Sequence, residues 1–170
     1  AAGEAWARTP IALSDDVGEK ERWNGIVVDA TGIEDTQDLR AVYLILHARI
    51  RRLASSGRVV VLARPPESAA SVTQSAVRRA LDGFTRSLAR ELGRKGSTAN
   101  LLVVPAGAED RVDAPLRFLL SARSAYVSGQ PWVVSPSVSA PAALPWRRPL
   151  DGKVALVTGG AQGIGAATCR

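Results

Sequence analysis

A glycine-rich run near the end of the sequence holds the densest group of residues that could do chemistry. Four of the fifteen glycines lie between residues 159 and 165, after a β-branched segment at 153–158 and before a predicted helix start. This frame suits a dinucleotide pyrophosphate, because glycines let backbone N–H groups approach the phosphates and the helix N-terminus adds a positive dipole. The predicted cofactor-binding residues are Thr158, Gly159, Ala161, Gln162, Gly163, Ile164 and Gly165.

A glycine-rich turn without a ligand is the alternative to this interpretation. The predicted strand before the run and the helix start after it favour the nucleotide site. A mononucleotide P-loop fits less well, because no Gly-Lys-Ser or Gly-Lys-Thr ends the run. The residue that selects NAD or NADP is expected at the end of the next strand, beyond Arg170, so the sequence does not decide between the two cofactors.

The remaining reactive side chains stand apart from one another. His47 has no second His and no Cys near it, so we predict no metal site. Ser68 and Ser71 lie in a predicted loop that offers no candidate base. The single cysteine, Cys169, excludes a disulfide framework and is expected to pack against a helix.

Alternating strands and helices must position these residues, and they predict an α/β fold. Short β-branched runs bounded by small residues or Pro are typical of buried parallel strands, and apolar spacings of three and four are typical of helices. The expected strands are 25–32, 57–63, 99–104 and 132–134, and the expected helices are 36–55, 70–92 and 114–121. This order predicts a Rossmann- or flavodoxin-like parallel sheet, incomplete at both ends, with right-handed crossovers that place helices on its two faces.

The composition changes near residue 135, where we place a domain boundary. Five of the ten prolines lie between residues 131 and 149, which is typical of a semi-rigid linker. We therefore expect an α/β domain at 1–134, a linker at 135–149, and the first strand and phosphate turn of a second domain at 150–170. The chain has no Met and opens at Ala1, so we interpret it as an internal piece of a longer protein. Residues 150–170 are then expected to be poorly ordered or non-natively docked in isolation.

The chain has 170 residues and a formal net charge of +6, with 46% hydrophobic residues. This composition predicts a globular protein without a membrane span, and we expect it in the cytoplasm. Its arginines are spread over two predicted amphipathic helices without an aromatic stacking platform. Solvated helix faces are the simplest interpretation, docking of an acidic partner is the second, and a nucleic-acid partner is not expected.

Several segments resemble the short-chain dehydrogenase/reductase family. The run Leu150-Asp151-Gly152-Lys153 through Gly165 is similar to that family's opening strand and its Thr-Gly-x-x-x-Gly-Ile-Gly signature. Residues 83–93 resemble the segment that follows the family's catalytic tyrosine and lysine, and residues 126–130 resemble the turn before its last strand. The order of an altered reductase-like unit, a Pro-rich linker and an intact fingerprint is similar to bacterial high-molecular-weight 3-oxoacyl-acyl-carrier-protein reductases.

The first unit departs from the family pattern at each active-site position. The resemblance places the catalytic tyrosine on Gln74 and the lysine on Arg78, while the serine position falls near Arg64, with Ser68 and Ser71 as alternatives. The Asn-Asn-Ala-Gly turn becomes residues 29–32, Asp-Ala-Thr-Gly, and the helix asparagine becomes Asp38. Carbonyl reduction needs a phenol acid beside an ammonium group, and Gln74 carries no titratable proton. We therefore predict that this unit has no catalytic residues.

The resemblance implies a parent enzyme that reduces a 3-oxoacyl thioester to the 3-hydroxyacyl thioester with NAD(P)H, as in fatty acid biosynthesis. Its catalytic serine, tyrosine and lysine would lie beyond Arg170, so the present chain is expected to be inactive alone. The implied partners are an acyl carrier protein or CoA thioester substrate and further copies of the chain, as a dimer or tetramer. The helix at 70–92 is the expected interface, with Leu81→Asp and Phe84→Asp as tests.

Two other functions stay open from the sequence alone. The first unit could be an interaction or dimerisation module that has no chemistry of its own. A polyketide-type ketoreductase also pairs an altered half with a catalytic half, although its fingerprint usually differs from the segment at 150–153. The coding sequence on either side of the chain would distinguish these functions.

Overall fold

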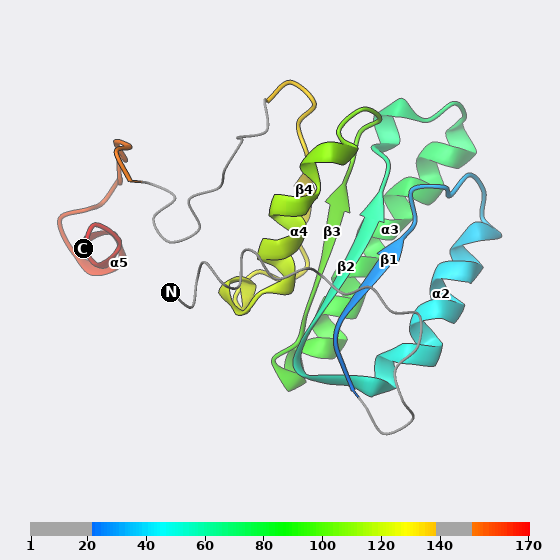
Figure 1. Ribbon diagram of the computed structural model, residues 1–170, viewed down its shortest axis with the longest axis horizontal. Helices are drawn as coiled ribbons and strands as arrows, with labels where there is room; N and C mark the ends of the chain where they lie inside the picture. Colours follow the sequence, from blue (N-terminus) through cyan, green and yellow to red (C-terminus); the bar gives the residue numbers. More distant parts are fainter. Residues whose placement is uncertain (1–21, 139–150) are drawn as a thin grey trace. The chain divides into compact units, whose positions relative to one another are not determined.

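Four parallel strands, arranged in the order β1-β2-β3-β4, form the sheet of the first described part (Figure 1). The computed structural model describes residues 22–138 and 151–170, and the two parts are treated separately. The strands are β1 (Trp23–Asp29), β2 (Leu53–Ala63), β3 (Thr98–Val103) and β4 (Pro131–Val133). All six residues of β3 are buried, as expected for a strand covered on both faces of a parallel sheet.

Helices cover both faces of this sheet and divide its core into two clusters. The helices are α2 (Asp38–Arg49), α3 (Val72–Leu92) and α4 (Asp113–Leu120). The buried side chains of α2 and α3 pack with Val59 and Val61 of β2. Leu119 of α4 packs instead with Val60 and Leu102, which alternation along the strands directs to the other face. Within the described residues, then, α2 and α3 share one face and α4 lies on the other, as Figure 1 shows.

The crossover through α4 has the opposite hand to the two before it. The strands advance in one direction across the sheet, so three crossovers of one hand would place all three helices on one face. Helices were correctly expected on both faces, but the expectation that right-handed crossovers alone would put them there is wrong. The apolar residues of α4 pack against β2 and β3 on the second face, and this burial outweighs the usual preference of hand.

The helix expected at 36–55 is too long at its C-terminal end. The α-helix ends at Arg49, a single 3₁₀ turn covers Ile50–Arg52, and β2 begins at Leu53. Leu53 pairs with Trp23 across the sheet and is only 2% exposed. The pairing then shifts between Trp23 and Gly25, so that Gly25 lies opposite Arg58. The sheet reaches back to Leu53 because its side chain enters the core next to Gly57, where a Cβ would lie 2.6 Å from the Leu53 side chain.

The strand expected at 153–158 is absent from the second described part. Residues 153–157 have no secondary structure, and Val154 and Leu156 are almost fully exposed. A strand needs a neighbour for its backbone N–H and C=O groups, and residues 151–170 form no ladder among the residues that the structure describes. The only helix in residues 151–170 is α5 (Gly163–Thr168).

The predicted linker, 135–149, lies mostly outside the described residues, and the domain boundaries remain a prediction. Across residues 22–138 and 151–170, no helix has the length and apolar character needed to cross a bilayer. The same residues hold no group of three His, Cys, Asp or Glu side chains placed to bind a metal ion. His47 stacks on Tyr43 instead, with ring centroids 5.2 Å apart.

Candidate functional site

The backbone of the glycine-rich run favours glycine at three of its positions. Gly159 and Gly163 adopt φ values of +68° and +57°, in the left-handed region that disfavours residues with a Cβ. A Cβ on Gly165 would collide with the carbonyl of Gly159. The predicted residues from Thr158 to Gly165 therefore form a tight turn, in which Gly165 at the start of α5 packs against the backbone of Gly159.

The start of α5 leaves backbone donors available to a ligand. Gln162 precedes the helix in an extended conformation, and its side chain makes no capping hydrogen bond. The turn residues Thr158, Ala161 and Gln162 are exposed. Cys169 is also exposed, although its sulfur lies 3.2 Å from the position that a Cβ on Gly160 would occupy. An anion at this turn would be bound by backbone N–H groups, as a pyrophosphate is.

Gln74, the residue at the tyrosine position, caps the start of α3. The Ser71 hydroxyl accepts a hydrogen bond from the Gln74 backbone N–H at 3.1 Å, and the Gln74 side-chain oxygen accepts one from the Ala70 N–H at 2.6 Å. This is a variant of the capping box, in which the glutamine side chain reaches back to a free backbone donor. The spacing Ser-x-x-Gln at 71–74 is the sequence signal for this cap.

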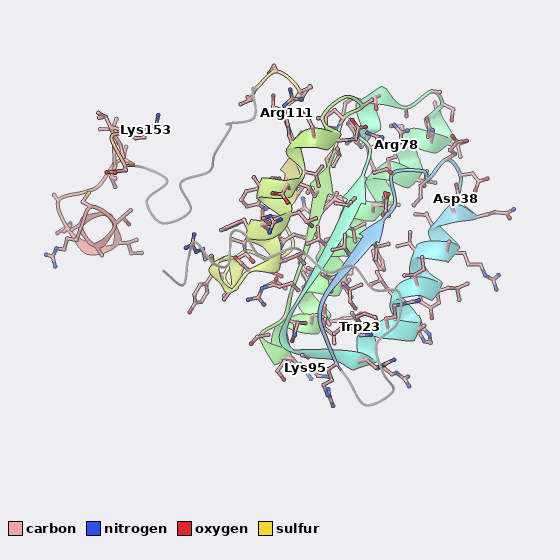
Figure 2. All side chains as sticks on the ribbon, viewed as in Figure 1. Trp23, Asp38, Arg78, Lys95, Arg111 and Lys153 are labelled. Atoms are coloured by element: carbon pink, nitrogen blue, oxygen red, sulfur yellow. The ribbon has the colours of Figure 1, made fainter. Side chains whose placement is uncertain are left out.

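Arg78, at the lysine position, is bonded to the loop that follows β2. Its Nη1 donates to the carbonyl oxygen of Pro65 at 3.0 Å and to the Ser68 hydroxyl at 3.1 Å. The Ser68 hydroxyl itself donates to the Pro65 carbonyl, so it has no base beside it. Figure 2 shows Arg78 at the end of the sheet where the strands finish. A lysine ammonium in a reductase must face the catalytic acid, whereas the Arg78 guanidinium donates its hydrogen bonds to the Pro65–Ser68 loop.

Arg64, near the serine position, also has a structural contact. Its Nη1 donates to the Glu109 carboxylate at 2.7 Å and to the Val104 carbonyl at 3.1 Å. The hydrogen bond from Arg64 lowers the pKa of the exposed Glu109 carboxyl below its ordinary value. The pair links the loops that follow β2 and β3, and it offers no nucleophile and no acid of suitable pKa.

The loop after β1 is acidic where the resemblance places the family's Asn-Asn-Ala-Gly turn. Asp29 accepts hydrogen bonds from the backbone N–H and the hydroxyl of Thr31, at 2.9 and 2.7 Å. Asp38 accepts hydrogen bonds from the backbone N–H groups of Glu34 and Asp35, which lower the pKa of the Asp38 carboxyl. Carboxylates of this loop are unfavourable neighbours for a pyrophosphate. The Asp29 and Asp38 carboxylates thus place negative charge at this edge of the first part.

Comparisons with known proteins establish the fold. No family model and no curated protein matches the chain. A blue fluorescent protein from a metagenomic library, crystallised with NADPH, matches at 22% identity and a TM-score of 0.56, covering 69% of this chain and 65% of that chain. A short-chain dehydrogenase from Burkholderia cenocepacia J2315, crystallised with NADP, matches at 20% identity and a TM-score of 0.54. The match covers 66% of this chain and 64% of that chain.

An acetoin dehydrogenase from Salmonella typhimurium also matches, at 18% identity and a TM-score of 0.55, with 68% of this chain and 64% of that chain covered. The chain thus spans less than two thirds of the length of these structures. At such identities the likeness establishes the architecture alone. The predicted class is confirmed: this is a Rossmann-like α/β fold with a parallel sheet, of the kind found in short-chain dehydrogenases and reductases.

Proposed function

We propose that the chain is part of an NAD(P)H-dependent oxidoreductase of the short-chain dehydrogenase/reductase type. In this proposal the turn from Thr158 to Gly165 begins the cofactor site, and residues 22–138 form a unit without catalytic residues. The observation that carries it is the backbone of the turn, where positive φ values favour glycine at 159 and 163 and a Cβ on Gly165 would collide with Gly159. Solved structures of similar fold were crystallised with NADPH or NADP, which supports the same cofactor class.

The chemistry of this chain would be limited to holding the cofactor. NAD(P)H, when bound, supplies a hydride to the carbonyl carbon of the substrate. The residues of the turn would bind the pyrophosphate through backbone N–H groups and the helix dipole of α5. Gln74, Arg78 and Arg64 are committed to local hydrogen bonds, so the proton donor would come from residues beyond Arg170. The present chain would then be inactive alone.

The proposed substrate is a 3-oxoacyl thioester carried by acyl carrier protein or CoA. Its support is the resemblance of the segment from Leu150 to Gly165 to 3-oxoacyl-acyl-carrier-protein reductases. A polyketide-type ketoreductase is the alternative within the same reaction class. The coding sequence after Arg170 tests the proposal first: an in-frame serine and Tyr-x-x-x-Lys support it, and a stop codon directly after Arg170 contradicts it.

A pair of glycine substitutions tests the cofactor site in the protein that contains this chain. Gly163 and Gly107 both have positive φ values, +57° and +81°, and neither would place a Cβ within 4 Å of another group. Alanine therefore strains the backbone similarly at both positions. We expect Gly163→Ala to weaken NADPH or NADH binding by about tenfold or more and Gly107→Ala to change it by less than about twofold, by fluorescence titration. Equal effects would contradict the site.

A role in self-association is a second function that one observation favours. On α2, Tyr43, Leu44 and Ile45 are 53%, 51% and 40% exposed, although they are large and apolar. Exposed small residues of α3, including Ala76, Ala80 and Gly83, lie on a helix that covers the same face of the sheet. We propose that this face, made by α2 and α3, contacts a second copy of the chain. Leu81 is 1% exposed and Phe84 packs on the core, so aspartate at either position would test folding instead.

A further inference from the structure

Basic side chains gather at the end of the sheet where the strands begin. Six of these residues define what we call the amino-edge cluster. Arg22 precedes β1, Arg49 ends α2, and Arg51 lies in the 3₁₀ turn after α2. Arg90 lies in the last turn of α3, and Arg94 and Lys95 lie in the 3₁₀ turn Gly93–Lys95 that follows it. All are exposed except Arg49, which is half-buried. Figure 2 shows Trp23 and Lys95 at this end and Asp38, Arg78 and Arg111 at the opposite end.

Contacts between the segments that follow the two 3₁₀ turns bring the cluster together. The Ser97 hydroxyl, just after Lys95, accepts from the Gly57 N–H at 3.0 Å and donates to the Ala54 carbonyl at 3.3 Å. A Cβ on Gly96 would lie 3.2 Å from the hydroxyl oxygen of Ser56. The segment that follows the first 3₁₀ turn thus lies against the segment that follows the second, and the cluster forms one surface.

The acidic residues of the first part lie elsewhere. Among the described residues of the segments that carry the cluster, Glu91 is the only carboxylate, so the six cations leave a formal surplus of five there. Glu21, next to Arg22 in the sequence, lies outside the described residues. None of the six forms an ion pair among the described residues, whose ion pairs use Arg64, Arg79, Arg86, Arg111 and Arg117. Most carboxylates instead follow the carboxyl ends of the strands, as Asp29, Glu34 and Glu109 do.

Helix dipoles explain only part of this arrangement. Cations near helix C-termini are favourable, because each terminus carries about half a negative charge. The C-terminal ends of α2 and α3 therefore contribute about one negative charge together, and the surplus of the cluster is several times larger. The uncompensated part of that surplus creates a positive field over the surface, which steers and holds a polyanion.

We propose that the amino-edge cluster docks an acidic protein surface. Trp23 is half-buried, and the Arg52 guanidinium lies 5.9 Å from the centroid of its ring, so this ring offers no free platform for base stacking. The cluster is formed by helix C-terminal ends, which place no helix or ribbon for entry into a DNA groove. Carboxylates on a folded partner need neither feature, and they pair well with arginine. The inference does not depend on the proposed cofactor site, which lies in residues 158–165.

The test uses the full 170-residue chain and fluorescently labelled poly-L-glutamate as the probe. The first variant combines Arg51→Gln, Arg94→Gln and Lys95→Gln. Its matched control combines Arg40→Gln, Arg79→Gln and Arg86→Gln, exposed residues outside the cluster, and removes the same net charge. We expect the first variant to bind the probe about tenfold more weakly and the control to change binding by less than about twofold, with both affinities falling as salt rises.

Three outcomes would overturn the proposal. Equal losses in the two variants would show that net charge alone binds the probe. Failure of the wild-type chain to bind poly-L-glutamate would remove the docking surface. Tighter binding of a DNA duplex or of anionic lipid vesicles than of poly-L-glutamate, with the same cluster dependence, would assign the surface to another class of partner. Circular dichroism of both variants controls for folding, since all six substituted side chains lie on the surface.

Discussion

At the position where the family resemblance places the catalytic tyrosine, Gln74 pairs with Ser71 to cap a helix. Ser71 supplies the cap of α3 and Gln74 reaches back to the Ala70 N–H, so both side chains stabilise the start of the longest helix. Arg78, one turn later, fixes the Pro65–Ser68 loop. These hydrogen bonds occupy the side chains of Gln74 and Arg78, and they are the residue-level support for our proposal that this unit has no catalytic residues.

Removing this cap should cost stability and leave the fold intact. We expect Ser71→Ala to lower the free energy of unfolding by about 1 kcal/mol, because the first turn of α3 loses an acceptor for the Gln74 N–H. Urea denaturation followed by circular dichroism measures this change. Thr73→Ala is the matched control: Thr73 is exposed in the same turn, and alanine there keeps or raises stability because of its helix propensity. Equal losses in both variants would contradict the capping role.

Among the elements, α3 carries one face that packs in the core and one exposed face, so substitutions on it can test folding and association separately. Leu81 is buried in the core cluster, while Ala80 beside it is exposed on the proposed interface. We expect Leu81→Asp to unfold the first part, since an unpaired buried charge costs more than about 3 kcal/mol. Ala80→Glu should keep the helix content and lower the oligomer mass. Circular dichroism and light scattering coupled to gel filtration measure the two effects. An unchanged mass in a folded Ala80→Glu protein would contradict an interface on this face.

Patterns along the sequence predicted the elements where local and tertiary preferences agree. The helix expected at 70–92 was found at Val72–Leu92, because its apolar spacing fits a single amphipathic face. Leu53 continued the spacing of Leu46 and Ile50 equally well, so the sequence could not show that the sheet would take it. The hydrogen bonds from Arg64 to Val104 and from Arg78 to Pro65 join residues 40 and 13 positions apart, and no pattern of spacing predicts such contacts.

For the whole molecule, strand pairing decides which apolar segments are ordered. Leu101–Val103 of β3 have ladder partners in both β2 and β4 and lie in the buried centre of the sheet. Residues 153–157 are similarly rich in Val, Ala and Leu, yet they have no ladder partner among the described residues. A sequence typical of a strand thus forms one only where a neighbouring strand supplies hydrogen-bond partners for its backbone.

Amide hydrogen exchange on the 170-residue chain tests this difference directly. The amides of Leu101–Val103 open only with the sheet, so their exchange should be slowed by about a thousandfold or more relative to residues 153–157, which should exchange almost freely. The helix α5 offers an internal reference, because Ala166 and Cys169 donate backbone hydrogen bonds to Gln162 and Gly165 within a short helix and should show weak protection. Strong protection at 153–157 in this chain would mean that the segment has found a pairing partner, and the absence of a strand there would then be wrong. Protection gained at 153–157 only in a longer protein would place the missing neighbour strand outside residues 1–170, as the proposed cofactor domain requires.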